Sequence, residues 1–216
     1  MIKTLINPAL SLDKASPIAT FVFAHGAGAG QDSEFMQYMA EQLAMRNINV
    51  VRFNFAYMQL ALELGKRRPP DRADKLLAHF NQVLSELDTD LPIFIGGKSM
   101  GGRMASMLLE ESKAKGCICM GYPFHPPAKT EKLRTEHLAD ITKPMLILQG
   151  ERDTFGSREE VVNYPLSKQI SVRYLVDGDH SFKPRKASGY TLEQNLNIVV
   201  KAVEDFIKSQ VTKTKL

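Results

Sequence analysis

Short runs rich in β-branched and aromatic residues alternate with longer amphipathic stretches along most of this chain. The runs expected to form strands span residues 18–24, 48–53, 91–95, 116–121, 144–150 and 170–176. The stretches expected to form helices span residues 33–45, 71–87, about 100–114 and 192–207. Elements that alternate in this way form βαβ units, so neighbouring strands run parallel and helices cover both faces of the sheet. We therefore expect one α/β domain over residues 1–216, without a large lid domain.

Charge, cysteine content and apolar runs exclude several classes of protein. The net charge of +4 comes from basic residues that are mixed with acids, and no basic stripe with interleaved aromatics predicts a nucleic-acid partner. Cys117 and Cys119 are two residues apart in a predicted strand, which places them on one face as free, buried thiols of a reducing compartment. Residues 1–8 resemble no secretory leader, and no apolar run reaches the roughly eighteen residues of a membrane span. These features predict a cytoplasmic protein that does not bind membranes.

Residues 97–101, Gly-Lys-Ser-Met-Gly, match the pattern G-x-S-x-G between a predicted strand and a predicted helix. In such a nucleophile elbow the serine sits on a strained, sharp turn, where larger flanking side chains would collide with the neighbouring strand and helix. Gly102 and Ala105 let the helix lie close to the sheet, and its N-terminus directs amide dipoles at a developing negative charge. The pattern is short enough to arise by chance, in which case Ser99 would be idle.

Two further residues strengthen the interpretation of Ser99 as a nucleophile. Asp153 follows the predicted strand 144–150, and His180 follows the strand 170–176. Active sites of parallel α/β sheets lie at the carboxyl ends of the strands, where all three residues are expected. His180 would take the proton of Ser99, and Asp153 would orient the imidazole and stabilise the imidazolium, completing a catalytic triad.

Other residues compete for the acid and base roles. Asp177 and Asp179 lie close to His180 in sequence and are rivals of Asp153, which could instead serve as a helix cap or turn residue. The other histidines are expected elsewhere: His25 bracing a glycine loop through hydrogen bonds, His79 on a helix surface, and His125 and His137 in the proline-rich loop 122–142.

Residues 25–30, His-Gly-Ala-Gly-Ala-Gly, follow the first predicted long strand. The backbone amide of Ala27, together with that of Met100, is expected to form the oxyanion hole. A dinucleotide-binding loop would need a third glycine where Gln31 or Ser33 stands, depending on the register. The sequence also lacks a phosphate-binding P-loop and a cluster with metal-ligand spacing, so we expect no cofactor and no metal.

With these residues in place, the chain resembles the α/β-hydrolase superfamily over almost its whole length. The segments that look more specific are residues 25–28, 66–72, 97–103, 121–127 and 149–156. They resemble the small hydrolases related to the testis-expressed and NSL-complex-subunit proteins, relatives of the dienelactone-hydrolase branch. The resemblance implies a lidless serine hydrolase with the triad Ser99, Asp153 and His180. It implies no substrate, and some eukaryotic relatives serve as subunits of larger assemblies.

Two segments could contribute to binding a substrate. Arg67, Arg68 and Arg72 flank a proline pair, and they are expected either to bind a carboxylate or phosphate of the substrate or to pair with local acids. Tyr122 and Phe124 are expected either to form an apolar wall of the pocket or to pack on the core in a rigid loop.

The function that these residues favour is hydrolysis of a small ester, thioester or amide through an acyl-enzyme on Ser99, with a carboxylic ester as the leading substrate class. Transfer of the acyl group to an acceptor other than water would use the same residues. The alternative is a binding or scaffold protein that keeps the fold and the triad without turnover.

Overall fold

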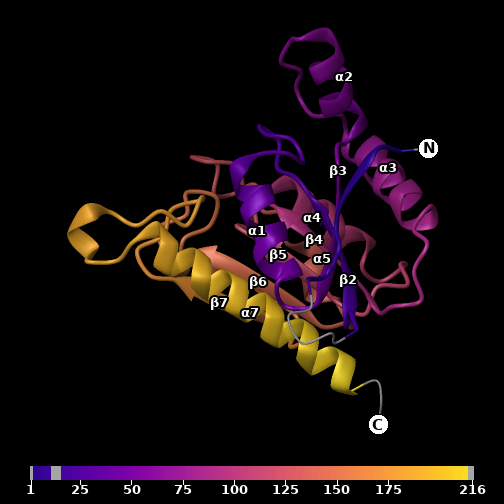
Figure 1. Ribbon diagram of the computed structural model, residues 1–216. Helices are drawn as coiled ribbons and strands as arrows, with labels where there is room; N and C mark the ends of the chain where they lie inside the picture. The colour runs from indigo at the N-terminus through magenta and orange to yellow at the C-terminus, as the bar shows by residue number, and fades with distance from the viewer. Residues whose placement is uncertain (1, 11–15, 214–216) are drawn as a thin grey trace.

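The computed structural model describes residues 2–10 and 16–213, which form a seven-stranded sheet with helices on both faces (Figure 1). The strand order is β1-β3-β2-β4-β5-β6-β7. The strands are β1 (Thr4–Asn7), β2 (Ala19–Ala24), β3 (Ile48–Phe53), β4 (Ile93–Lys98), β5 (Cys117–Met120), β6 (Met145–Gly150) and β7 (Ile170–Leu175). Strands β2 to β7 are all parallel, which confirms the predicted sheet. Strand β1 was not predicted from the sequence and runs antiparallel to β3 at one edge.

The helices pack in two layers, with α1 and α7 on one face of the sheet and α3 and α4 on the other. The helices are α1 (Glu34–Ala44), α2 (Ala56–Leu64), α3 (Ala73–Ser85), α4 (Met100–Leu108), α5 (Glu136–Ala139), α6 (Arg158–Val161) and α7 (Leu192–Lys213), with a 3₁₀ turn η1 at Lys186–Ser188. Figure 1 shows α1 and α7 side by side across the sheet. Within the described residues, the connections between strands hold no separate lid domain.

Alternate residues of each central strand feed these two layers, because successive side chains of a strand point to opposite faces. On β2, Phe21 and Phe23 pack in the layer of α1 and α7, whereas Val22 lies in the layer of α3 and α4. Both faces of β2 are therefore apolar, as is typical of a parallel strand covered on both sides. On β5, Cys117 and Cys119 share the α3 and α4 face as buried free thiols, which confirms the prediction for these residues.

Helix α2 was also not predicted, and it projects from the top of the molecule in Figure 1. Tyr57 is its buried residue, whereas Leu60, Leu62 and Leu64 are all exposed. Seven of its nine residues are apolar, so its sequence does not separate a core-facing side from a polar side.

Two predicted helix ends were misplaced. Helix α4 ends at Leu108, where the sequence suggested a helix to about residue 114, and α7 continues past Ile207 to Lys213. None of the helices in the described ranges has the length and apolar character that crossing a membrane would need.

Candidate active site

Ser99 stands at the sharp turn between β4 and α4. Its backbone has φ 51° and ψ −114°, a conformation that costs energy for a residue with a Cβ and is held by its surroundings. The Ser99 N–H donates to the carbonyl oxygen of Met120 on β5 at 3.0 Å. A Cβ at Gly97 or at Gly101 would each lie 2.5 Å from the carbonyl oxygen of Ala24, so only glycine fits on either side of Ser99. The turn is the one that the G-x-S-x-G pattern predicts.

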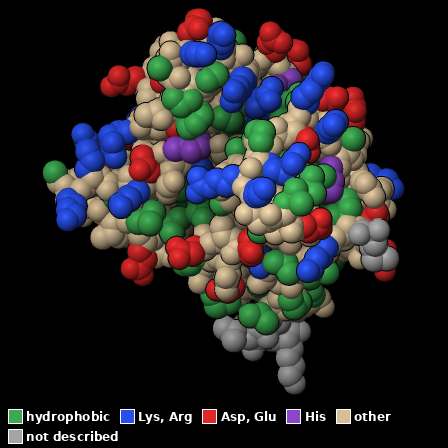
Figure 2. All heavy atoms as spheres, turned by 90° about the horizontal axis from the view of Figure 1, so that it is seen from above, with side chains coloured by type: hydrophobic (Ala, Val, Ile, Leu, Met, Phe, Trp, Pro, Cys, Tyr) green, Lys and Arg blue, Asp and Glu red, His purple; other side chains and the backbone are tan. Residues whose placement is uncertain are grey.

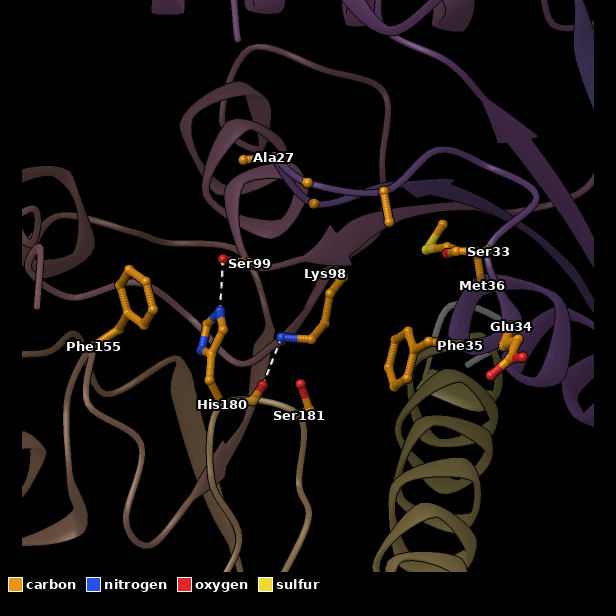
Figure 3. A pocket seen from close by; sticks show the side chains of 13 residues that line it. Ala27, Ser33, Glu34, Phe35, Met36, Lys98, Ser99, Phe155, His180 and Ser181 are labelled. Atoms are coloured by element: carbon orange, nitrogen blue, oxygen red, sulfur yellow. Dashed lines mark hydrogen bonds between the residues drawn. The ribbon is translucent and has the colours of Figure 1, made fainter. Parts of the chain in front are cut away.

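The structure brings Ser99, His180 and Asp153 into one hydrogen-bonded chain. Ser99 Oγ lies 2.9 Å from His180 Nε2, and His180 Nδ1 lies 2.8 Å from Asp153 Oδ2. Figure 3 shows the imidazole pointing at the Ser99 hydroxyl, beside the ring of Phe155, whose centre lies 4.3 Å from that of His180. Ser99 is partly exposed and Asp153 is completely buried. The hydroxyl is therefore open to a ligand, while the carboxylate is sealed behind the imidazole.

The Asp153 carboxylate is held by partners besides His180. Gln149 Nε2 donates to Asp153 Oδ2 at 3.0 Å, and the Phe155 N–H donates to Asp153 Oδ1 at 2.9 Å. Gln149 is completely buried at the end of β6, where its Nε2 also donates to the Gly156 carbonyl and its Oε1 accepts the Tyr122 N–H at 2.8 Å. Sequence analysis did not single out Gln149, although a glutamine in an otherwise apolar buried strand is a signal that could have found it.

Replacing Gln149 with leucine is expected to lower kcat by about 10²-fold with little change in KM, because a small displacement of Asp153 misorients the imidazole. The exposed Gln169→Leu variant provides the control and should keep the kcat of the unmodified chain. Circular dichroism would verify that both variants fold. A folded Gln149→Leu variant with unchanged kcat would show that this contact does not position Asp153.

The two rival aspartates are engaged with other partners. The Asp177 carboxylate accepts hydrogen bonds from the Arg185 guanidinium and forms an ion pair with Arg152 at 2.8 Å. These contacts, with the Arg185 hydrogen bond first, lower the pKa of Asp177 to about 2. Asp179 Oδ1 instead accepts the backbone N–H groups of Ser181 and Lys183 and closes the turn around His180.

Two further side chains hold the His180 segment in place. Lys98 Nζ donates to the His180 carbonyl oxygen at 2.7 Å (Figure 3), and burial lowers the pKa of Lys98 to about 8. Asn195, completely buried on α7, donates through Nδ2 to the carbonyls of Val176 and Phe182. Sequence analysis missed both braces. A single amide on the apolar face of a helix is the signal that could have identified Asn195.

Ala27 and Met100, whose amides are expected to form the oxyanion hole, line one cavity together with Ser99. Met100 is the first residue of α4, where N–H groups have no acceptor within the helix. Ala27 lies in the loop after β2 and lines a cavity together with Ser99. His25 braces this loop, as predicted: its Nδ1 donates to the Gly26 carbonyl at 2.6 Å, and its Nε2 accepts the Phe55 N–H at 3.1 Å. Burial lowers the pKa of His25 to about 4, so the ring is neutral near pH 7.

Ser99 lies on a wall shared by two cavities. The first has a volume of about 630 Å³ and is lined by small and apolar residues and by the polar residues Ser33, Glu34, Lys98, His180 and Ser181. The second has a volume of about 390 Å³ and adjoins Ser99, Met100 and Phe155. Seen from above, the molecule carries basic and acidic side chains interspersed with apolar surface (Figure 2).

Tyr122 and Phe124 do not line either cavity beside Ser99. Both are completely buried, their ring centres are 4.8 Å apart, and Phe124 also packs on Tyr164. The two side chains therefore pack on the core and do not form a wall of the pocket, which is the second of the two expectations for this segment. The Tyr122 hydroxyl donates to the Arg134 carbonyl at 2.9 Å and so anchors the loop that follows.

The three arginines singled out in the sequence lie apart from the Ser99 hydroxyl. Arg67 and Arg68 border a separate cavity of about 440 Å³, which Ala27 and Gly28 also line. Arg72 is 87% exposed and forms an ion pair with Asp74 at 3.5 Å. Of the two expectations for Arg72, the structure therefore shows the ion pair with a local acid.

The expectation that His79 lies on the surface was wrong. Its ring is half-buried and stacks on Phe53 at 6.0 Å between centres. His125 packs near Glu160, and His137 Nε2 contacts Ser106 Oγ at 2.8 Å, both in or beside the proline-rich loop. Among the described residues, no group of three or more His, Cys, Asp and Glu side chains is arranged to hold a metal ion.

Comparison with known proteins gives a family and a fold. The family model described as "Alpha/beta hydrolase domain" matches residues 17–208. Similar solved structures include an alpha-beta serine hydrolase homologue from Coxiella burnetii, with 16% identity, a TM-score of 0.69 and coverage of 95% of this chain and 90% of that one. Est1E from Butyrivibrio proteoclasticus with bound ferulic acid has 15% identity, a TM-score of 0.69 and coverage of 98% and 96%. Dienelactone hydrolase from Anabaena variabilis has 17% identity, a TM-score of 0.69 and coverage of 96% and 91%.

At these identities the solved structures show a shared fold, which is the lidless α/β-hydrolase fold expected from the sequence. The family match extends over most of the chain and includes the segments that carry Ser99, Asp153 and His180. The chain belongs to the family of alpha/beta hydrolase domains.

Proposed function

We propose that this chain is a serine hydrolase that cleaves a small carboxylic ester, or a related thioester or amide, through an acyl-enzyme on Ser99. The observation that carries the proposal is the continuous hydrogen-bonded chain from Ser99 Oγ through His180 to the buried carboxylate of Asp153. The serine hydrolases and esterases among the structural neighbours support the broader class of hydrolase.

In the proposed reaction, Ser99 Oγ attacks the carbonyl carbon while His180 Nε2 takes its proton. Asp153 keeps the Nδ1–H of His180 in place and stabilises the imidazolium that forms. The N–H groups of Ala27 and Met100 would bind the oxyanion, where charge develops during the attack. His180 then gives its proton to the leaving group, and a water molecule repeats the sequence to release the acid. No step requires a metal or an organic cofactor.

Labelling with a fluorophosphonate probe tests the proposal directly. We expect the native chain to react at Ser99 because a serine with an adjacent general base is far more nucleophilic than an isolated hydroxyl. Mass spectrometry would place the adduct on the peptide that contains residue 99, and heat-denatured protein is the control that should remain unlabelled. A native chain that does not react would favour the alternative of a binding or scaffold protein.

A further inference from the structure

We propose that Arg103 and Arg134 form an anion-binding subsite for the acyl half of the substrate, so that the preferred substrates are esters whose acyl chain ends in a carboxylate. This inference rests on the proposed serine hydrolase function and names its substrate class. It is carried by the charged lining of the smaller cavity beside Ser99.

The two arginines reach this cavity from different parts of the fold. Arg103 is on α4, one helical turn after Ser99, and its backbone N–H donates to the Ser99 carbonyl at 3.0 Å. Arg134 comes from the loop before α5, and both side chains line the cavity of about 390 Å³. The backbone of Arg134 is anchored at two points, by the Tyr122 hydroxyl at 2.9 Å and by the Phe124 carbonyl at 2.8 Å. Tyr122 and Phe124 thus fix the backbone from which the Arg134 side chain extends.

Neither guanidinium has a partner among the residues that the structure describes. No hydrogen bond or ion pair engages the side chain of Arg134 or of Arg103, and the Nε atom of Arg103 is buried without an acceptor. A buried donor of a charged group is costly unless an acceptor satisfies it. A planar guanidinium matches the two oxygens of a carboxylate, and the pair therefore indicates an anionic ligand.

The neighbouring titratable groups do not neutralise the two arginines. Asp71 is the acid that lines this cavity, but it forms no ion pair with either arginine. His137 lies close to Arg103 and is neutral near pH 7, because burial and then the Arg103 charge lower its pKa to about 4. Arg103 and Arg134 line the same cavity, and burial, followed by the Arg103 charge, lowers the pKa of Arg134. The cavity keeps an excess of positive charge for a ligand.

The reaction geometry assigns this cavity to the acyl half. The leaving group must lie beside His180 Nε2, from which it receives a proton. His180 and Ser181 line the larger cavity and are not part of the smaller one. The larger cavity therefore takes the leaving group, and the acyl chain extends towards Arg103 and Arg134. Lys98 lines the leaving-group side, where its ammonium is already used on the His180 carbonyl.

The test compares two esters that share a leaving group: mono-4-nitrophenyl glutarate and the neutral 4-nitrophenyl hexanoate of similar size. The intact chain is expected to hydrolyse the glutarate ester with a kcat/KM about 10-fold to 100-fold higher, the range that a charge-assisted hydrogen bond provides. Arg103→Gln and Arg134→Gln are each expected to lower kcat/KM for the glutarate ester more than for the hexanoate ester and so to remove most of this preference, which is read as the ratio of the two kcat/KM values. Arg173→Gln, which alters an exposed arginine on β7, is the matched control and should keep the preference.

Two further measurements separate this inference from the proposed function. Fluorophosphonate labelling should persist in both cavity variants, which shows that they fold and keep an activated Ser99. Free glutarate should bind the intact chain in calorimetry and bind each variant at least 10-fold more weakly, a readout that needs no turnover. Equal kcat/KM values for the two esters would overturn the proposed subsite, and so would a preference for the glutarate ester that persists in both variants. Labelling of Ser99 in the same experiments would still support the proposed hydrolase function. Absence of labelling with intact glutarate binding would overturn the hydrolase alone.

Discussion

The Ser99→Ala variant is expected to lose hydrolytic activity by about 10⁶-fold in kcat, the loss seen when the nucleophile of a serine protease triad is removed. Ser99 Oγ is the only atom of the triad that would bond to the substrate, and alanine leaves the rest of the site in place. The strained backbone at this position has already accepted a Cβ, so the substitution should leave the fold unchanged. The rate of 4-nitrophenyl ester hydrolysis measures the effect, and the fluorophosphonate adduct should disappear with it.

Ser106→Ala is the matched control for this loss. Ser106 is buried on the same helix, and its hydroxyl donates to the Arg103 carbonyl and contacts His137 without touching Ser99. It should retain activity within a few-fold and label normally. If the Ser99→Ala variant still hydrolysed the ester, and this activity co-purified with the protein, a different group would perform the attack.

The Asp153→Asn variant is expected to lower kcat by about 10⁴-fold, the size of the effect in a serine protease triad. Asp153 Oδ2 accepts from both His180 Nδ1 and Gln149 Nε2, whereas Oδ1 accepts from the Phe155 N–H. An asparagine places an NH₂ group opposite one of these donors, so the imidazole is driven to the tautomer that cannot take the Ser99 proton. Steady-state kinetics would give kcat, and thermal unfolding would verify that the buried amide is tolerated.

Asp177→Asn and Asp179→Asn test whether the acid is assigned correctly. Asp177 is occupied by Arg152 and Arg185, and Asp179 closes the turn that carries His180. Their loss should change stability or loop position more than it changes the chemistry, with kcat remaining far above that of Asp153→Asn. A 10⁴-fold loss in either of them, with Asp153→Asn active, would show that the acid is not Asp153.

The parallel core could be predicted from the sequence because the apolar pattern of each strand lies within a few consecutive residues. The run of β2 is apolar at every residue except Thr20, which is typical of a strand covered on both faces. The meeting of residues 99, 153 and 180 could be predicted because the carboxyl ends of parallel strands share one edge of the sheet. Neither inference required knowledge of which side chains touch.

The elements that were missed carry weak local signals. Strand β1 has four residues, and none of them is buried, so its pairing depends on the exposed edge of β3. Helix α2 is apolar at seven of its nine positions, three of them exposed leucines, so its sequence does not show which side faces the core. Tyr122 and Phe124 were open to two interpretations because a sequence does not say whether an aromatic side chain points into a cavity or into the core.

The charged residues that line the cavities could not be predicted from the sequence either. Arg103 and Arg134 are thirty-one positions apart in the numbering, and only the return of the loop before α5 brings them to one cavity. The sequence instead drew attention to Arg67, Arg68 and Arg72, which flank a proline pair but do not line a cavity with the Ser99 hydroxyl. Proximity along the chain was a poor guide here because separate loops build the rim of the sheet.

The position of Ser99 on a wall common to two cavities has a consequence for how products would depart. In the proposed reaction, an ester seated across this wall would be divided into halves that occupy the two cavities. The alcohol can leave while the acyl group still fills its own compartment, and the vacated room admits the water that completes the turnover. Selectivity for the two halves can accordingly change independently, through substitutions in one compartment that leave the other as it was.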